Sequence, residues 1–156
     1  MSDSDQPLRR EYPYGQSAML SLHYARHIAY ALSDPHIRTD HLLGGIVQAK
    51  TSTLTLIRMR TPPGVIQPLI AGMRRYASQE EELDEHGLAA EALQPTATLL
   101  RVQKRHASTV VELLEREEID SDCLLGGLLM AEHGLGYQIL HRAGASLRTY
   151  FRSVRG

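Results

Sequence analysis

The sequence lacks several features that define large classes of proteins. Its 156 residues include a single cysteine, Cys123, so no disulfide can form within the chain, which is typical of a reducing compartment. No apolar run approaches the roughly 18 residues of a membrane span, and residues 1–14 lack the hydrophobic stretch of a signal peptide. We therefore expect a soluble, cytoplasmic protein that does not bind membranes.

An excess of charge of one sign is also absent. Lysine and arginine number 17 and aspartate and glutamate 18, which gives a net charge of −1. The uniform basic field expected of a nucleic-acid-binding protein is therefore missing, and we predict no nucleic-acid partner. Short basic groups beside acidic or apolar sequence are interpreted as ordinary solvated helix faces. These groups are Arg58/Arg60, Arg74/Arg75 and Arg101/Lys104/Arg105.

Signatures of catalysis are missing as well. The chain has no G-x-x-x-x-G-K-[ST] loop to cradle phosphates, no nucleophile elbow, no Ser-His-Asp signature and no paired-cysteine zinc pattern. His23 and His27 lie four residues apart, a spacing that can chelate a metal, and a metal-dependent helical enzyme is the hypothesis they would support. Because no third ligand of comparable placement is evident, we predict a non-enzyme without cofactor or metal.

The most informative feature present is an internal repeat. Residues 39–46, TDHLLGGI, return 82 positions later as SDCLLGGL, and sliding residues 17–47 onto 99–129 needs no gap. Eight of the 31 aligned positions are identical, and many others pair apolar with apolar residues. Internal repeats determine architecture, so the chain is predicted to consist of two copies of one helical unit.

The spacing of apolar residues predicts helices throughout both copies. Residues 17–33 carry an apolar stripe at four-three spacing, which Asp34-Pro35 should end. Thr39 and Ser121 are predicted as the N-caps of equivalent helices, and Ser146 as the N-cap of the last one. No stretch alternates with period two, so strands are not expected. The predicted fold is all-α, with about eight helices in two tandem four-helix repeats related by a pseudo-twofold axis.

The predicted domain organisation follows from this repeat. Residues 1–14 are read as a disordered tail, residues 15–76 as the first repeat and residues 95–156 as the second, opened by Pro95. Residues 77–94 are read as an acidic linker, and residues 15–156 together as one compact domain.

Four glycines lie within predicted helices, as the pairs Gly44-Gly45 and Gly126-Gly127. Each costs up to about 1 kcal/mol there relative to alanine. We therefore expect another helix to approach closely, at the interface between the repeats. Cys123 is expected to be a small core residue, because nothing near it indicates a thiolate nucleophile.

The two repeated stretches carry a family resemblance. Residues 37–46 and 119–128 resemble the I-G-T-E-H-L-L-L-G-L stretch found once in each repeat of the N-terminal domain of Clp-type AAA+ unfoldases, and the match covers residues 15–156. The resemblance implies a non-catalytic docking platform, here free-standing without the ATPase modules. The departures are Gly44 and Gly126 where the family usually has leucine, Asp40 and Asp122 where it has glutamate, Cys123 in place of histidine, and Pro62-Pro63 in place of a Leu-Gly turn.

By this resemblance, the chain would bind Clp unfoldase or protease subunits, adaptors or client proteins and regulate ATP-dependent proteolysis. Thr39, Asp40, Ser121 and Asp122 are the candidate binding residues, because each pair places a carboxylate beside free N–H groups at a helix start. In some family members the matching acids hold the guanidinium of phosphorylated arginine. A phosphoarginine or small-molecule sensor is therefore the alternative, and the remaining reading is that each aspartate only stabilises its helix, by roughly 0.3–1 kcal/mol.

Overall fold

The computed structural model describes residues 12–34, 37–74 and 97–155, and these contain eight α-helices and no strand. The prediction of an all-α protein with about eight helices is confirmed. None of the described helices combines the length and the apolar character that crossing a bilayer requires. The helices are α1 (Gln16–Ala31), α2 (Thr39–Ala49), α3 (Thr53–Arg58), α4 (Pro63–Arg74), α6 (Ala97–Leu113), α7 (Ser121–Ala131), α8 (Leu135–Arg142) and α9 (Leu147–Arg155).

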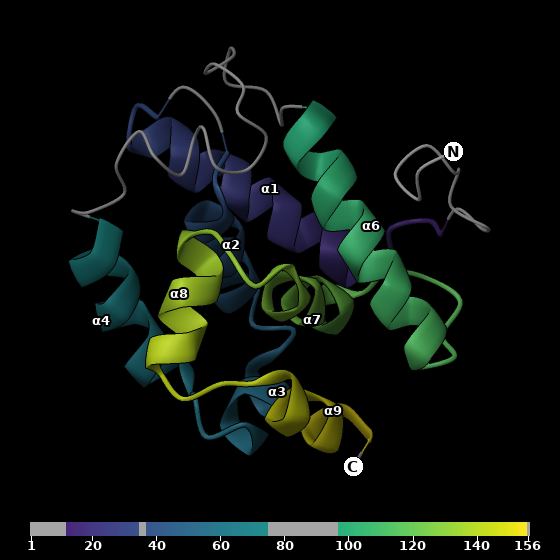
Figure 1. The fold of residues 1–156 in the computed structure, drawn as a ribbon. Coiled ribbons are helices and arrows are strands. Elements are labelled where there is room, and N and C mark those ends of the chain that lie inside the picture. Colours follow the sequence, from purple (N-terminus) through teal and green to yellow (C-terminus); the bar gives the residue numbers. More distant parts are fainter. Residues whose placement is uncertain (1–11, 35–36, 75–96, 156) are drawn as a thin grey trace.

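The helices are arranged around α7, which lies near the centre of Figure 1 with α1 and α6 above it and α3 and α9 below. Helix α1 packs along α2 and α6 along α7, while α8 packs against α2 and α4, and α9 against α3 and α7. The core is continuous across both halves of the chain, since Leu43 and Ile46 of α2 join Leu125 and Leu128 of α7 in one buried cluster. Burial of this shared apolar surface is the main force that holds the halves together.

Two of the glycines let helices approach closely, but within each half. A Cβ atom on Gly45 would lie 2.2 Å from the Ser21 carbonyl oxygen of α1, and one on Gly127 would lie 3.1 Å from the Ala107 nitrogen of α6. The predicted close approach is therefore correct, and its predicted place, the interface between the repeats, is wrong. The reason is that α1 and α6 each lie directly across the helix that follows them in the chain.

The repeat extends to backbone conformation at the helix ends. Ser33 and Glu115, 82 positions apart, both have positive φ, of 57° and 56°. Lys50 and Glu132, again 82 apart, have φ of 61° and 57°. Arg60 and Gly144, which follow α3 and α8 and also have positive φ, are 84 apart because α8 has eight residues and α3 has six. Gly134, with φ of 90°, is not matched, since Ser52 at the equivalent position has φ of −116°. Chain reversals thus recur at matched positions, while the twofold axis itself stays a prediction.

The N-terminal segment is ordered further than the sequence suggests. Tyr12 is buried in the core, and the Ile119 N–H donates to the Pro13 carbonyl oxygen at 2.9 Å. The prediction of disorder is therefore wrong for residues 12–14, because the Tyr12 ring gains a buried contact that the composition of the segment does not reveal. The rest of the tail, the predicted linker at residues 77–94 and Pro95 lie outside the described residues.

Candidate functional site

The two helix starts that the sequence singles out begin one residue earlier than expected. Arg38 and Asp120 hold the extended backbone of the N-cap position, so Thr39 and Ser121 are the first helical residues. The N-cap predictions for Thr39 and Ser121 are wrong because their hydroxyl groups bond to the other half of the molecule instead. The N-cap prediction for Ser146 is confirmed, since its Oγ accepts from the Thr149 N–H at 3.2 Å.

Thr39 and Ser121 make contacts that join the halves. The Gly136 N–H of α8 donates to the Thr39 Oγ1 at 2.9 Å. In the opposite direction, the Ser121 Oγ lies 2.6 Å from the Ser52 Oγ and accepts from the Thr51 Oγ1 at 2.9 Å. Thr39 and Ser121 are both buried. Buried hydrogen-bonded hydroxyls of this kind hold helices in register, and neither faces solvent for a ligand.

Asp40 lies in a closed cluster of charges at the start of α2. Its side chain is fully buried, its Oδ1 accepts from the Arg38 Nε at 3.0 Å, and its Oδ2 accepts from the Arg74 Nε at 2.8 Å. Burial by itself would raise the pKa of Asp40, but the neighbouring His41 and Arg38, with hydrogen bonds from Arg38 and Arg74, lower it. The carboxylate is therefore ionised and already neutralised by two guanidinium groups of the protein itself.

His41 completes this cluster and takes over the capping role. Its Nδ1 accepts from the Arg38 backbone N–H at 2.8 Å, and its Nε2 lies 2.6 Å from the Asp34 Oδ2. Because Nδ1 is an acceptor, the ring is neutral with its proton on Nε2, which donates to Asp34. Burial lowers the pKa of His41, although Asp40 and Asp34 act in the opposite direction.

The start of α7 uses the same backbone with different side chains. The Asp120 Oδ1 accepts from the Cys123 N–H at 2.8 Å, which is the N-cap hydrogen bond that α2 lacks. The other carboxylate oxygen of Asp120 accepts from Arg116. Cys123 is fully buried, and burial raises the pKa of its thiol to about 12. The thiol is therefore a core group, as the sequence indicates, and not a nucleophile.

Asp122 differs from its counterpart Asp40 in that it is open. Its side chain is 21% exposed and its Oδ2 lies 3.9 Å from the Arg116 Nη1, at the limit of an ion pair. Its Oδ1 is shielded from solvent and has no hydrogen-bond partner among the described residues. A buried carboxylate oxygen without a donor is energetically costly, so among the described candidate-site residues Asp122 is the one whose carboxylate retains unused capacity to accept a hydrogen bond. An external donor reaches this oxygen only if the atoms that shield it move.

The cluster around Asp40 contains residues that sequence reasoning missed. Asp34 and Arg38 are four apart, as are Arg116 and Asp120 at positions 82 further on, with acid and base exchanged. This exchanged pair is a signal that the repeat could have revealed. The role of Arg74 carries no such signal, because it depends on how α4 folds back onto the start of α2.

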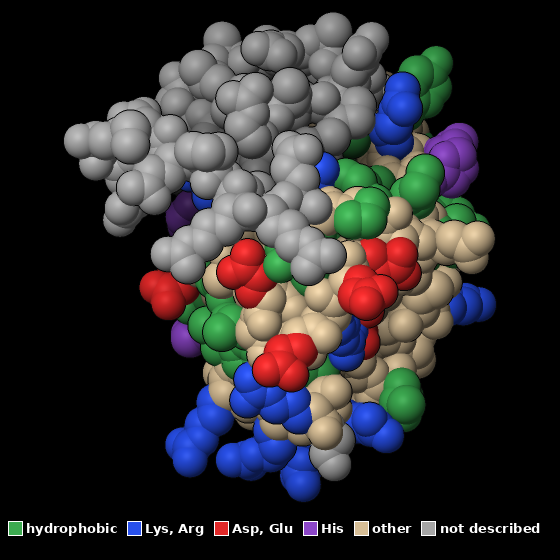
Figure 2. Space-filling model, turned by 90° about the vertical axis from the view of Figure 1, so that its right-hand side faces the viewer, with side chains coloured by type: hydrophobic (Ala, Val, Ile, Leu, Met, Phe, Trp, Pro, Cys, Tyr) green, Lys and Arg blue, Asp and Glu red, His purple; other side chains and the backbone are tan. Residues whose placement is uncertain are grey.

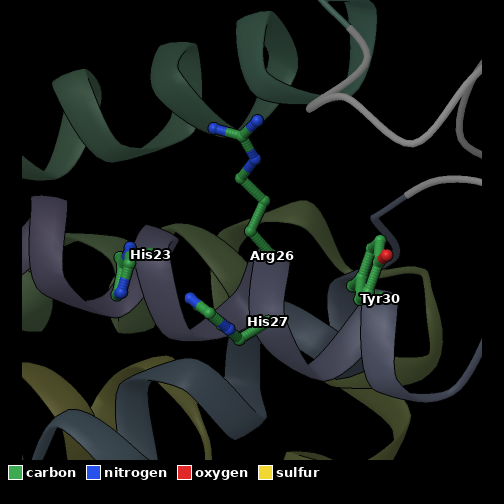
Figure 3. Close-up of a pocket in the computed structure, with 4 residues that line it drawn as sticks. All are labelled: His23, Arg26, His27 and Tyr30. Atoms are coloured by element: carbon green, nitrogen blue, oxygen red, sulfur yellow. The ribbon is translucent and has the colours of Figure 1, made fainter.

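The histidine pair forms a separate feature on α1. The His23 and His27 rings are 4.5 Å apart between centroids, and with Arg26 and Tyr30 they line an open pocket of about 430 Å³. In Figure 3 His27 extends toward His23, while Arg26 extends away from both rings. No group of three or more His, Cys, Asp or Glu side chains that could hold a metal occurs in the described part of the chain. The third ligand that a metalloenzyme would need is thus not found among these residues.

Comparison with known proteins adds no relative. No protein-family model matches the chain, and no curated protein matches it. The resemblance to the Clp N-terminal domain therefore stays a prediction that depends on the two repeated stretches.

Proposed function

We propose that this chain is a non-catalytic protein-interaction module that binds Clp unfoldase or protease subunits, adaptors or client proteins and regulates ATP-dependent proteolysis. The two stretches that resemble the Clp N-terminal domain supply the identity of the partners. The matched helix ends of the two halves support the double-repeat organisation that the resemblance implies.

The observation that carries the proposal is the exposed apolar face of α3. Leu54 is 59% and Ile57 53% exposed, and they lie one helical turn apart on the same face. Val65, at the start of α4, is 43% exposed. Neighbouring apolar side chains left in water are typical of a protein-binding surface. The candidate acids are less suited to docking a protein, because Asp40 is fully buried.

A binding assay with a purified Clp unfoldase tests this proposal. We expect the wild-type chain to retain the unfoldase and the Leu54→Asp/Ile57→Asp variant to lose it, because two charges would enter an apolar contact. Leu32→Asp/Leu113→Asp is the matched control, since it adds the same charge at exposed leucines at the C-terminal ends of α1 and α6. Failure of the wild-type chain to bind, or equal loss in both variants, would contradict the proposed role of α3.

The alternative function, a phosphoarginine sensor, is favoured by one observation, the unpartnered Oδ1 of Asp122. In calorimetric titrations with free phosphoarginine, this alternative expects one site that Asp122→Asn removes. Equal heats from the wild-type chain and Asp122→Asn would eliminate this alternative without affecting the test on α3.

A further inference from the structure

The charges of this nearly neutral protein are unevenly distributed along the sequence. All 18 aspartates and glutamates lie in residues 1–40 and 80–132. Residues 41–79 and 133–156 contain no acidic residue, although they include arginines and a lysine. The net charge of −1 therefore conceals two segments that are entirely basic in their charged side chains.

The fold brings these two acid-free segments together. Helices α3 and α4 come from the first and α8 and α9 from the second, and α3 packs against α9 while α4 packs against α8. Lysine and arginine side chains gather at the lower end of Figure 2, the end at which α3 and α9 lie in Figure 1, and acidic side chains lie higher. Like charges separated by some 90 residues thus share one end of the molecule.

An open pocket of about 400 Å³ lies between these segments. Arg58 at the end of α3, Arg60 just after it and Arg152 on α9 are exposed around the pocket. We name these three side chains the arginine pocket. Buried Met59 and the hydroxyl residues Thr149 and Ser153 complete the lining, which contains no acidic side chain among the described residues.

The hydrogen-bonding capacity of the pocket is that of its guanidinium groups. Within the described ranges, none of the three arginines makes an ion pair or side-chain hydrogen bond. Both hydroxyl protons are already used, because the Ser153 Oγ donates to the Thr149 carbonyl oxygen at 2.7 Å and the Thr149 Oγ1 donates to the Ser146 carbonyl oxygen at 3.0 Å. A complementary ligand is therefore rich in acceptors and negatively charged.

We propose that the arginine pocket binds a small molecule carrying two linked phosphate groups. The planar fork of a guanidinium donates two parallel hydrogen bonds to two oxygens of a phosphate. A single carboxylate has too few oxygens to accept from all three arginines in this way. One phosphate monoester carries about −1.5 to −2 charges at pH 7, so a diphosphate matches three guanidinium groups more closely. A volume of about 400 Å³ is within the range of small-molecule sites. This site does not depend on the proposed docking function.

Calorimetry of the full chain with inorganic pyrophosphate, at physiological salt, tests the proposal. We expect one saturable site, and Arg58→Ala/Arg152→Ala should weaken it by about tenfold or more, the loss of two charge-assisted contacts. The matched control is Arg142→Ala/Arg148→Ala, which removes the same charge from exposed residues of the second acid-free segment, residues 133–156, outside the pocket lining. The control should weaken binding by less than about twofold.

An additional variant and two additional ligands distinguish phosphate recognition from general charge attraction. Arg58→Lys/Arg152→Lys keeps the charge but not the fork, and should give an affinity between those of wild type and the alanine variant. The proposal is overturned by the absence of saturable binding, by equal weakening in the pocket and control variants, or by equal affinity for citrate. Tighter binding of a short single-stranded RNA than of pyrophosphate would also overturn it, in favour of a nucleic-acid backbone.

Discussion

The starts of α2 and α7 have the same backbone geometry, but their side chains stabilise it in different ways. At α2 the side chain of the third helical residue, His41, accepts from the N-cap N–H; at α7 the N-cap side chain of Asp120 accepts from the N–H of Cys123. Each start thus has one half of a reciprocal capping box. Acid and base are also exchanged between the paired positions 34/116 and 38/120.

The consequence of this difference is that one carboxylate is closed and the other open. Asp40 is buried between Arg38 and Arg74, whereas Asp122 is partly exposed and its Oδ1 lacks a partner in the described structure. The two copies of one motif have therefore separated into a structural cluster and a candidate contact point. Asp40 and Asp122, which are equivalent in the sequence repeat, therefore have different surroundings in the structure.

The largest expected effect that tests this comparison is that of Asp40→Asn. It leaves the guanidinium of Arg74 without a negative partner among the described residues and the buried guanidinium of Arg38 with Asp34 alone, at 3.4 Å, and should lower the free energy of unfolding by about 3 kcal/mol. Asp122→Asn should cost no more than about 1 kcal/mol, because its ion pair is long and partly exposed. Urea denaturation of both variants measures the difference, and equal losses would show that the two starts are energetically alike.

A smaller difference is expected where the helices of each half cross. Gly45→Ala should cost near the upper end of about 1–3 kcal/mol, because its Cβ would collide with backbone atoms of α1. Gly127→Ala meets the backbone of α6 at a longer distance and should cost less. Thermal unfolding of the two variants provides the comparison. Gly44→Ala is the control: its Cβ would meet only the ends of the Ile28 and Arg74 side chains and no backbone atom, so a loss as large as that of Gly45→Ala would refute the explanation.

A smaller effect is expected on the pH dependence of the free energy of unfolding, to which the start of α2 should contribute and the start of α7 should not. The folded chain holds the pKa of His41 below its ordinary value of 6.5, so the unfolded chain binds the proton first as the pH falls. The contribution to stability is complete above pH 6.5 and decreases as the pH falls through that value. Cys123 occupies the matching position in α7 and does not titrate in this range.

Denaturant midpoints between pH 7.5 and pH 5 measure this effect. His41→Gln should reduce the dependence on pH, and part of it should remain, because burial also lowers the pKa of His106. If His41→Gln left the change of midpoint with pH unaltered, the His41 ring would have to gain its proton equally in the folded and unfolded states.

The last test concerns the reactivity of Cys123 and involves no change in stability. Its thiol is buried and its pKa is raised to about 12, so a thiol reagent at neutral pH should label the folded chain far more slowly than the chain in urea. The labelling rates of the folded and the urea-unfolded chain are measured from the absorbance of the chromophore that the reagent releases. Rapid labelling of the folded chain would mean that the start of α7 opens in solution.

Helix class and number could be predicted because they follow from apolar periodicity and from the repeat, which are local properties of the sequence. The N-caps could not, since a threonine or serine before a helix looks like a cap until its hydroxyl is seen to bond to Gly136 or Ser52 in the other half. The order of Tyr12 and the pairing of Arg74 with Asp40 likewise depend on contacts distant in sequence. The candidate binding residues stay a prediction, and the sequence could not show that Asp40 is paired with two arginines of the protein while the Oδ1 of Asp122 has no partner in the described structure.

The residues with positive φ that follow several helices have a practical consequence for stability. Among the described residues, five non-glycine side chains hold this conformation: Ser33, Lys50, Arg60, Glu115 and Glu132. L-residues pay roughly 1–2 kcal/mol for it, which glycine avoids in part. Glycine at the four positions outside the arginine pocket should therefore raise the melting temperature, by roughly 2–4 °C for each kcal/mol gained. Glycine substitutions at these four positions alone should thus give a more heat-resistant form of the protein, without altering any of the surfaces proposed to bind.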